Sequence, residues 1–507
     1  MEFWEDAVKV ALIGTERQNL DRENLPESVR LLASQLDFSH QEDAFLKTAA
    51  LLMNYEQAGR NNPVLNFNLP HPSSPEEKAS CSDYALQTLA AILEEGFLIL
   101  LFNWAQTCIA HQQVVQEAYI PLLLDEGRKN IKMRPLIKSV SGQRGAWLAA
   151  FNDNWDYLNQ TEAEIWEQGK PEERKQLLLQ LRQENPARAR DLLIAAWKEE
   201  NANSRAELIS TFSENLSLAD ESMLQELQTD KSQKVKEAVV SLLNQLAGSE
   251  WVATLWEEVK PWLTLKITKS FLAFTSEELE VKIPENLPSY LKKRGIQELS
   301  GSKTVSEQEY WLTQVLEGIP PSYWEHHLNA TPDKVLNLFT KHKSLRKVIP
   351  AFVTATGRFK DVRWAKLLLD EKLKENDWVQ IPSITHLYQL LSLLSKEDQQ
   401  LYFDNKLDKK SFPFGLSTLE FLLGLQFQWD LAFSIKAMQA LASDYSEKTM
   451  YGHYYRLLEL HPFLHPDVLP HLATIEPPDL ALSTRWHNLQ SKLIRALELK
   501  KQLAECF

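Results

Sequence analysis

Apolar and polar positions recur every 31 residues between residues 171 and 263, and this is the most regular pattern in the chain. Each unit contains two blocks whose apolar positions fall at i, i+1 and i+4, the stripe of an amphipathic helix. Pro186, Ser217 and Gly248 share the column between the blocks, where a turn is needed. Each unit is therefore predicted to be two antiparallel helices. The aligned columns are Arg174, Arg205, Lys236; Leu177, Leu208, Val239; Leu178, Ile209, Val240; Leu181, Phe212, Leu243; and Leu193, Leu224, Leu255.

One such unit cannot fold alone. About six buried apolar side chains contribute about 10 to 18 kcal/mol, whereas ordering the backbone of one unit costs about 30 to 60 kcal/mol of entropy. Stacking on neighbouring units must supply the difference. The chain has 507 residues and only 15 glycines, a composition that suits helices. The predicted fold class is therefore all-α, an α-solenoid of stacked helix pairs.

The remaining pattern divides the chain into five regions. The first helix, Phe3 to Ile13, has an apolar face that includes Ala7, Val8 and Leu12. Prolines with clustered Asn and Ser indicate a linker after residue 60, and alternation between Leu263 and Pro284 predicts a small β-ribbon inserted in the solenoid. The predicted regions are N-terminal helices at 1–60, a Pro-rich linker at 61–80, the helical solenoid at 81–263, the insert at 264–309 and a C-terminal helical region at 310–507.

Composition and charge restrict the class of protein. With 55 basic and 69 acidic residues the net charge is -14, which disfavours nucleic acid and anionic membranes and favours a protein partner. Cys81, Cys108 and Cys506 form no C-x-x-C pair and fit a reducing cytoplasm. The N-terminus is acidic where a signal peptide would be basic. The most apolar run, residues 97–110, is too short to span a membrane and is predicted to be a buried helix.

Residue spacing assembles no catalytic or cofactor site. Gly295 and the run 301–304 resemble a phosphate loop, but the glycines are six apart and Ser302 separates the second glycine from the lysine. Prolines interrupt the helix that would align a group of histidines, so these are predicted to be loop or cap residues. We therefore predict no catalytic residue, no cofactor and no metal site, and we assign most of the 15 tryptophans to the core. The histidines in question are His453, His461, His465 and His471.

Two basic clusters stand out in this acidic chain. Residues 127–152 contain six basic residues and no acid, and residues 331–366 contain nine basic residues and two acids. Solvated helix faces and compensation of helix dipoles are one explanation. The other is a docking surface for an acidic protein or for nucleic acid, in which case the members of the second cluster should share one face. The candidate partner-binding residues are Arg128, Lys129, Lys132 and Arg134 in the first basic cluster and Lys343, Arg346, Lys360 and Arg363 in the second basic cluster.

Short motifs follow one another along the first two thirds of the chain. They are the runs 11–17, 121–123, 142–148, 195–197, 230–232, 311–312 and 319–320, with Asp125, Gly127, Asn152, Trp155, Trp166, Gly169, Pro171, Arg174, Val235, Lys236, Ala238 and Trp324. This series resembles a widespread bacterial family that is catalogued as a domain of unknown function. The resemblance ends at Trp324 and leaves residues 331–507 without a recognised motif. It implies a HEAT-like helical scaffold, although the unit here is shorter than the 40 to 47 residues usual for HEAT repeats. The family's genes tend to neighbour those for MoxR-type AAA+ ATPases, von Willebrand A-domain proteins and SWIM zinc-finger proteins, and no catalytic residue is assigned to it.

Three functions remain open. The favoured one is a non-catalytic α-solenoid scaffold or adaptor in the cytoplasm that binds a protein partner along the concave face that such stacks create. The resemblance suggests a MoxR-type ATPase or a von Willebrand A-domain protein as that partner. The alternative is a HEAT-like nucleic-acid-binding protein or DNA base-excision enzyme that uses the basic clusters, and salt-dependent DNA affinity would distinguish it. An unrecognised hydrolase comes third, because no nucleophile, base and orienting acid can be assembled.

Overall fold

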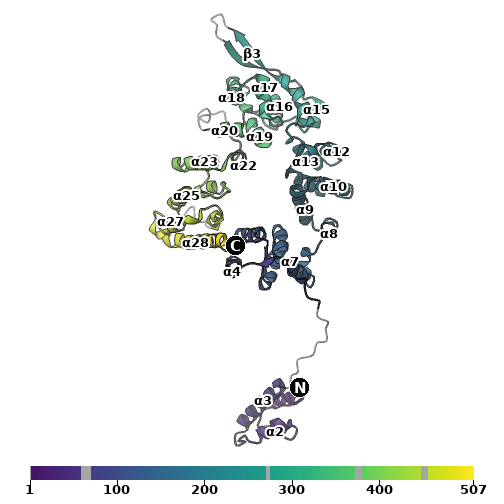
Figure 1. The fold of residues 1–507 in the computed structure, drawn as a ribbon, viewed down its shortest axis with the longest axis vertical. Coiled ribbons are helices and arrows are strands. Elements are labelled where there is room, and N and C mark those ends of the chain that lie inside the picture. Colours follow the sequence, from purple (N-terminus) through teal and green to yellow (C-terminus); the bar gives the residue numbers. More distant parts are fainter. Residues whose placement is uncertain (1, 59–69, 270–274, 371–379, 447–454) are drawn as a thin grey trace. The chain divides into compact units, whose positions relative to one another are not determined.

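The chain is divided into two compact units, whose helices and strands are labelled in Figure 1. The computed structural model describes residues 2–58, 70–269, 275–370, 380–446 and 455–507. The first unit spans Met1–Pro72 and the second spans Ser73–Phe507. Within the described residues the secondary structure is helical except for two sheets of two strands each. The prediction of an all-α, solenoid-like fold with a small β-ribbon is confirmed.

The first unit consists of three helices around a small core. Helices α1 (Glu2–Ile13) and α2 (Glu27–Ala33) both pack against α3 (Gln41–Ala58). The predicted apolar face of α1 is only partly correct. Ala7 is 2% exposed, but Val8 and Leu12 are 41% and 82% exposed. The stripe is wider than the contact surface that two neighbouring helices provide, so one of its edges remains uncovered.

The predicted linker ends before residue 80. Its residues 61–69 lie outside the described part of the chain, and the second unit already includes the residues that follow Pro72. The Glu76 carboxylate accepts the backbone N–H groups of Gln143 and Arg144 at 3.1 and 2.8 Å. Strand β1 (Ala79–Ser80) pairs in parallel with β2 (Gln113–Val114). These partners are distant in sequence, so local proline content could not reveal them.

The 31-residue units form three successive helix pairs, in which α9 contacts α11 and α11 contacts α13. Every aligned apolar position is buried except Val240, which is half-buried. The apolar stripes predicted from the sequence are therefore the contact surfaces of the stack. The helices of this region are α4 (Asp83–Glu95), α5 (Leu98–Ala110), α6 (Ile120–Lys129), α7 (Arg134–Ala149), α8 (Glu162–Gln168), α9 (Pro171–Glu184), α10 (Pro186–Ala196), α11 (Ala202–Ser210), α12 (Glu221–Leu227), α13 (Gln233–Leu243) and α14 (Glu250–Val259).

Each helix pair turns at the predicted column by a different local device. Pro186 is the first residue of α10, where its missing N–H costs no hydrogen bond. Ser217 caps the short 3-10 helix η5 (Leu218–Asp220) that leads into α12. Gly248 has a φ of 79°, a left-handed conformation that glycine adopts without steric cost. Three different residues at equivalent positions of the repeat thus each allow the chain to turn between the two helices of a pair.

The most apolar run forms α5, as predicted. Leu101 and Trp104 of this helix are buried, whereas Leu98 and Ile99 are each 44% exposed. In the described residues, no helix has both the length and the apolar character needed to cross a bilayer.

The predicted insert contains the expected β-ribbon but is not a separate region. Strand β3 (Leu263–Lys269) pairs antiparallel with β4 (Thr275–Val281). Leu279 is 5% exposed, whereas Ile267 is 57% exposed. The core that begins in α14 continues through the base of the ribbon and α15 (Ser289–Lys293) into the helices that follow. The insert is therefore packed into the second unit.

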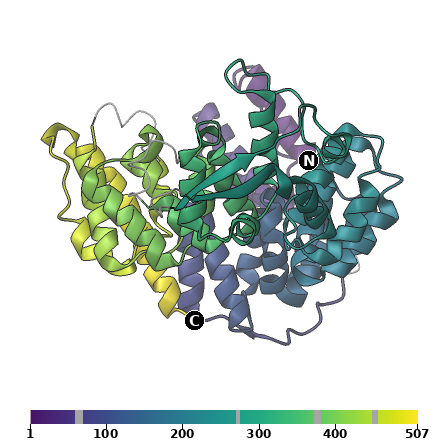
Figure 2. The same cartoon turned by 90° about the horizontal axis from the view of Figure 1, so that it is seen from above.

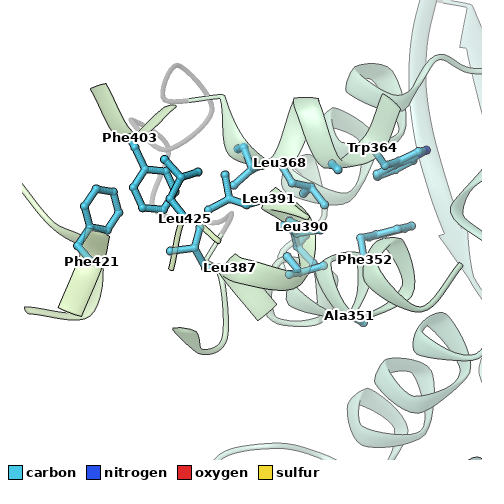
Figure 3. Packing of buried hydrophobic residues seen from close by; sticks show 14 of the residues in the cluster. Ala351, Phe352, Trp364, Leu368, Leu387, Leu390, Leu391, Phe403, Phe421 and Leu425 are labelled. Atoms are coloured by element: carbon cyan, nitrogen blue, oxygen red, sulfur yellow. The ribbon is translucent and has the colours of Figure 1, made fainter. Parts of the chain in front are cut away.

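The C-terminal region continues the helical stack, and aromatic pairs connect its helices (Figure 3). Phe352 stacks on Trp364 with ring centroids 4.9 Å apart, and Phe403 stacks on Phe421 at 4.3 Å. Every tryptophan in the described residues is buried or half-buried, which supports their assignment to the core. The helices are α16 (Glu307–Glu317), α17 (Pro321–Leu328), α18 (Pro332–Lys341), α19 (Pro350–Phe359), α20 (Val362–Leu369), α22 (Ile384–Leu391), α23 (Lys396–Lys409), α24 (Thr418–Leu422), α25 (Leu431–Ser443), α27 (Leu469–Leu472) and α28 (Ser483–Glu505).

The last helix packs against the first helices of the second unit, and we call this contact the seam. Helix α28 contacts α4 and α5, and the two views in Figures 1 and 2 show the C-terminus beside them. Leu503 shares one buried core with Trp104. The Ser82 hydroxyl donates to the backbone carbonyl of Cys506 at 2.9 Å. The second unit is therefore closed by contact between its two ends.

All three cysteines lie in the core at the seam as free thiols. Cys81, Cys108 and Cys506 are 2%, 0% and 5% exposed. The Cys108 thiol donates to the Gln113 carbonyl at 3.3 Å. The pKa of Cys108 is raised above the usual range. The hydrogen bond with Cys81 is the largest cause, and burial is the second. Cys108 therefore contributes to packing as a neutral thiol.

Two basic side chains lie next to the seam, Lys500 half-buried and His461 buried. The Lys500 ammonium donates to the carbonyls of Pro462 and Leu464 at 2.7 and 2.9 Å, and burial lowers the pKa of Lys500 to about 8. His461 is 5% exposed, and its ring lies 5.5 Å from that of Phe97. Burial is the main cause that lowers the pKa of His461, with the nearby Lys500 charge adding to it. Both groups therefore disfavour protonation in the folded state.

We expect Lys500 to make the folded state more stable as the pH rises from about 8 to 10.5. In this window the unfolded chain still holds the lysine proton that the folded chain has released, so a higher pH favours folding. The thermal midpoint of the wild type minus that of Lys500→Met should therefore be larger at about pH 10 than at about pH 7.5. A constant difference between the two proteins would contradict the lowered pKa.

We expect Leu208→Ala to lower the free energy of unfolding by about 2 to 5 kcal/mol, because it leaves a cavity at a buried position. Leu208 is 4% exposed, whereas Leu218 in the same helix pair is 54% exposed. The control Leu218→Ala should therefore cost less than about 0.5 kcal/mol. Urea unfolding followed by far-UV circular dichroism measures both changes. Equal losses would place Leu208 outside the core.

Candidate functional site

Arg134, predicted as a docking residue, is used inside the fold. Its guanidinium donates to the Glu173 carboxylate of α9 at 2.6 Å and to the Gly127 carbonyl at 3.1 Å. It also lies 4.6 Å from the centroid of the Tyr157 ring. The Arg134 and Glu173 side chains are 20% and 14% exposed. Arg134 thus links α7 to α9 and is not available to a partner.

Arg144 of the first basic cluster is half-buried and pairs with Glu117 at 2.5 Å, whereas the remaining members lie at the surface. Lys129 pairs with Glu126 at 2.6 Å across one helical turn, an exposed contact that contributes little. Arg128 and Lys132 are exposed and form no ion pair in the described part of the chain, and the same holds for Lys138 one turn into α7. The structure therefore leaves Arg128, Lys132 and Lys138 as the available cations of this region.

The second basic cluster is divided by a helix. Lys343 and Arg346 precede α19 and Lys360 and Arg363 follow it, so the length of a ten-residue helix, about 15 Å, separates the two pairs. Arg363 pairs with both oxygens of Glu325 at 3.0 Å. Arg346 donates to the Thr340 carbonyl at the end of α18. Lys343 and Lys360 are exposed. The two pairs therefore lie at opposite ends of α19.

The motif residues that carry the family resemblance have structural roles. Gly142 has a φ of 59° and breaks α7 into two segments, and Glu76 caps the second segment. A side chain at Gly142 would collide with the Glu76 carboxylate, since its Cβ would lie 2.3 Å away. The Trp155 indole donates to Asp125 at 3.0 Å. Gly142 thus shapes the middle of α7, and Trp155 holds η3 (Asp153–Leu158) against α6.

An open groove of about 680 Å³ lies beside the first basic cluster and is lined by α7, α8 and α9. We call it the α7–α9 groove. Its lining combines apolar residues, such as Leu136 and Ile165, with Lys138, Gln180 and Glu184. A mixed lining of this kind is typical of protein interfaces, whereas small-molecule sites are mostly apolar and enclosed. Arg134 and Lys138 are the basic residues that line it.

Two further hollows, of about 690 and 650 Å³, lie between α22 and α25 and share Lys396 and Phe427 as lining residues. Tyr388 and Leu391 line the first, and Leu401, which is 58% exposed, lines the second. We call the pair the α22–α25 groove. Grooves with mixed lining therefore occur at two separate places along the helical stack.

The model of a family described as Family of unknown function (DUF5691) matches residues 6–507. The chain belongs to this family. The match continues through residues 331–507, so the resemblance extends well beyond Trp324, where the sequence motifs ended. None of the curated proteins matches the chain. Membership of DUF5691 establishes the extent of the family region and assigns no activity.

The repeated basic column of this DUF5691 chain forms an arrangement that the sequence analysis missed. Arg174 lies 4.6 Å from the ring centroid of Trp166 and pairs with Glu200. Arg205, one unit later, lies 5.7 Å from Trp197 and pairs with Asp230 at 3.4 Å. Trp166 and Trp197 are themselves 31 residues apart. That second column was the available signal, and it shows that the repeated arginines join successive helix pairs.

A fully buried ion pair links two helix pairs of the stack. Arg182 of α9 and Asp220 of η5 are both 0% exposed, and two parallel hydrogen bonds of 2.9 and 2.8 Å join them. Arg190 adds a third at 2.9 Å. Burial raises the pKa of Asp220, but the hydrogen bonds from Arg182, the Ser217 N–H and Arg190 outweigh it and hold that pKa below the usual range. Asp220 is therefore a structural carboxylate.

The clustered histidines also have local roles. His461 Nδ1 lies 2.6 Å from the Leu458 carbonyl oxygen, and the His465 ring accepts the Asp467 N–H at 3.2 Å. His471 is exposed in the last turn of α27, and His453 lies outside the described residues. Across the ranges that the structure describes, no group of three or more His, Cys, Asp or Glu side chains is placed to hold a metal ion.

We expect Asp220→Asn to destabilise the fold by about 3 to 5 kcal/mol, because two arginines would remain without their buried carboxylate. Glu162→Gln is a matched control: Glu162 pairs with Arg188 at 2.6 Å, but both side chains are about half exposed. It should cost less than about 1 kcal/mol. Chemical unfolding of both variants provides the comparison. A similar cost for the two would show that burial adds nothing to the Arg182 pair.

Proposed function

We propose that this protein is a non-catalytic α-solenoid adaptor of HEAT-like helix pairs that binds a protein partner in the cytoplasm. The observation that carries the proposal is the presence of open grooves of mixed polar and apolar lining at two places along one helical stack. Repeat stacks bind polypeptides through such extended surfaces, where many weak contacts add up. The three free thiols suit a reducing compartment.

The partner that we propose is a MoxR-type AAA+ ATPase or a von Willebrand A-domain protein, the gene neighbours that the family resemblance implies. The cations available beside the α7–α9 groove are Arg128, Lys132 and Lys138, and their summed field would steer an acidic surface of the partner toward that groove. Arg134 is left out of this surface because it holds Glu173. Binding rather than catalysis is the role that these residues support.

We expect the triple charge reversal of Arg128, Lys132 and Lys138 to glutamate to reduce recovery of the ATPase or A-domain protein in a native pull-down. The physical reason is the loss of attraction between the basic surface and an acidic partner. The matched control reverses Lys198, Lys492 and Lys501, which are exposed residues outside both clusters and produce the same change of net charge. It should leave recovery unchanged. Recovery of the wild type without either candidate would refute the adaptor.

The same purified protein tests the nucleic-acid alternative. We expect no tight DNA or RNA binding at physiological salt, because the net charge is -14 and the second basic cluster is divided by α19. Fluorescence anisotropy over a series of salt concentrations measures this. Tight binding, with log K falling by about 0.9 per phosphate neutralised, would reverse the order of the two functions.

A further inference from the structure

Exposed apolar side chains are concentrated in the first unit. Of the 21 large hydrophobic residues that are exposed among the described residues, eight lie in Met1–Pro72, a small fraction of the 507-residue chain. Monomeric proteins rarely leave many such side chains uncovered in one small unit unless the surface binds something. The eight residues are Val8, Leu12, Ile13, Leu31, Leu32, Leu46, Met53 and Tyr55.

These side chains follow the periodicity of the helices that carry them. On α1, Val8 and Leu12 are one turn apart and form the uncovered edge of the helix's apolar stripe. On α3, Leu46 and Met53 are two turns apart, so they also share one side of their helix. The neighbouring positions supply the buried residues, such as Ala7 and Leu52. The apolar surface of each helix is therefore wider than the part that the unit's own core covers.

The charge around these side chains is negative. Residues 1–72 contain eleven acidic and six basic residues. Lys9 and Lys47 are each paired with an aspartate on the same helix, and Arg22 lies 3.4 Å from the centroid of the Phe38 ring. Glu5 and Glu42, by contrast, form no ion pair in the described residues, and each lies about one turn before an exposed apolar residue of its helix. Arg17 and Arg30 are also exposed and form no ion pair in the described residues, so the surface is acidic because carboxylates outnumber cations in the first unit.

We propose that the first unit is a docking module for a basic amphipathic helix of the protein partner, an assignment that deepens the proposed adaptor function. Leucine and methionine side chains receive the apolar face of such a helix, and carboxylates pair with its lysines or arginines. A second copy of this chain is the wrong occupant, since two acidic units would repel each other. Anionic lipid surfaces and nucleic acids are repelled for the same reason.

The test uses the full chain and a labelled synthetic helix of about 18 residues, built from Leu on one face and Lys on the other. Fluorescence anisotropy should show binding that weakens with added salt. The double variant Leu12→Gln with Leu46→Gln should bind about tenfold or more weakly, because two apolar contacts are lost. The control pair Leu122→Gln with Ile194→Gln changes residues that are 51% and 49% exposed in the second unit. It should alter affinity by less than about twofold.

Several outcomes would overturn the assignment. A second peptide has the same composition in scrambled order. If it binds equally well, the protein attracts the peptide by charge alone. Equal losses in the two double variants, or failure to bind the helix, would remove the docking site from the first unit. A wild-type dimer that the Leu12 and Leu46 changes dissociate would make a second copy the occupant. Binding to anionic vesicles would make it a lipid surface.

The same double variant separates this inference from the adaptor proposal. If it recovers the ATPase or A-domain partner as well as the wild type does, the adaptor stands and the docking module falls. If the wild type recovers neither candidate, the adaptor falls, and the peptide measurement still decides whether the first unit binds basic helices. Circular dichroism should show unchanged helicity, because Leu12 and Leu46 are 82% and 59% exposed.

Discussion

A stack of helix pairs has an apolar face at each end, and ordinary solenoids cover these faces with polar capping repeats. In the second unit the two ends cover each other. Leu499 and Leu503 of α28 enter the same core as the residues of α4 and α5. The helices in between are joined by shared cores and by the contacts described above. The seam is therefore the contact on which the remaining packing depends, since without it both ends of the stack would face water.

Polar side chains within the stack serve mainly to connect one helix pair with the next. Arg174 and Arg205 each combine an aromatic ring of the preceding segment with a carboxylate of the following one. The buried pair of Arg182 and Asp220 works across the same kind of boundary. Cation–π contacts and buried ion pairs are directional, so they select one arrangement of apolar surfaces that could otherwise slide. Gly142, one of the motif residues, also has a structural role, since it breaks α7 where the Glu76 carboxylate caps its second segment.

The sequence predicted those features that depend on local periodicity. Leu208 is buried and Leu263 begins a strand because the 3.6-residue and two-residue periods are properties of short segments. The sequence could not predict features that depend on distant partners. Arg134 finds Glu173 39 residues away and Arg363 finds Glu325 38 residues away, so neither pairing could be read from composition. The width of the apolar stripe on α1 could be read from the sequence. Which edge of the stripe is covered depends on the few helices that pack against α1, and those are not visible in the local sequence.

The seam also has a consequence for biosynthesis. Ser82 and Cys506 are 424 positions apart, yet their hydrogen bond is part of one core. A ribosome that adds about 5 to 20 residues per second needs roughly 20 to 80 seconds to make the intervening chain. During that time the faces of α4 and α5 that α28 will cover remain exposed. Each newly made molecule therefore passes through an aggregation-prone interval whose length is set by translation, and its demand for holding chaperones is highest before the last helix emerges.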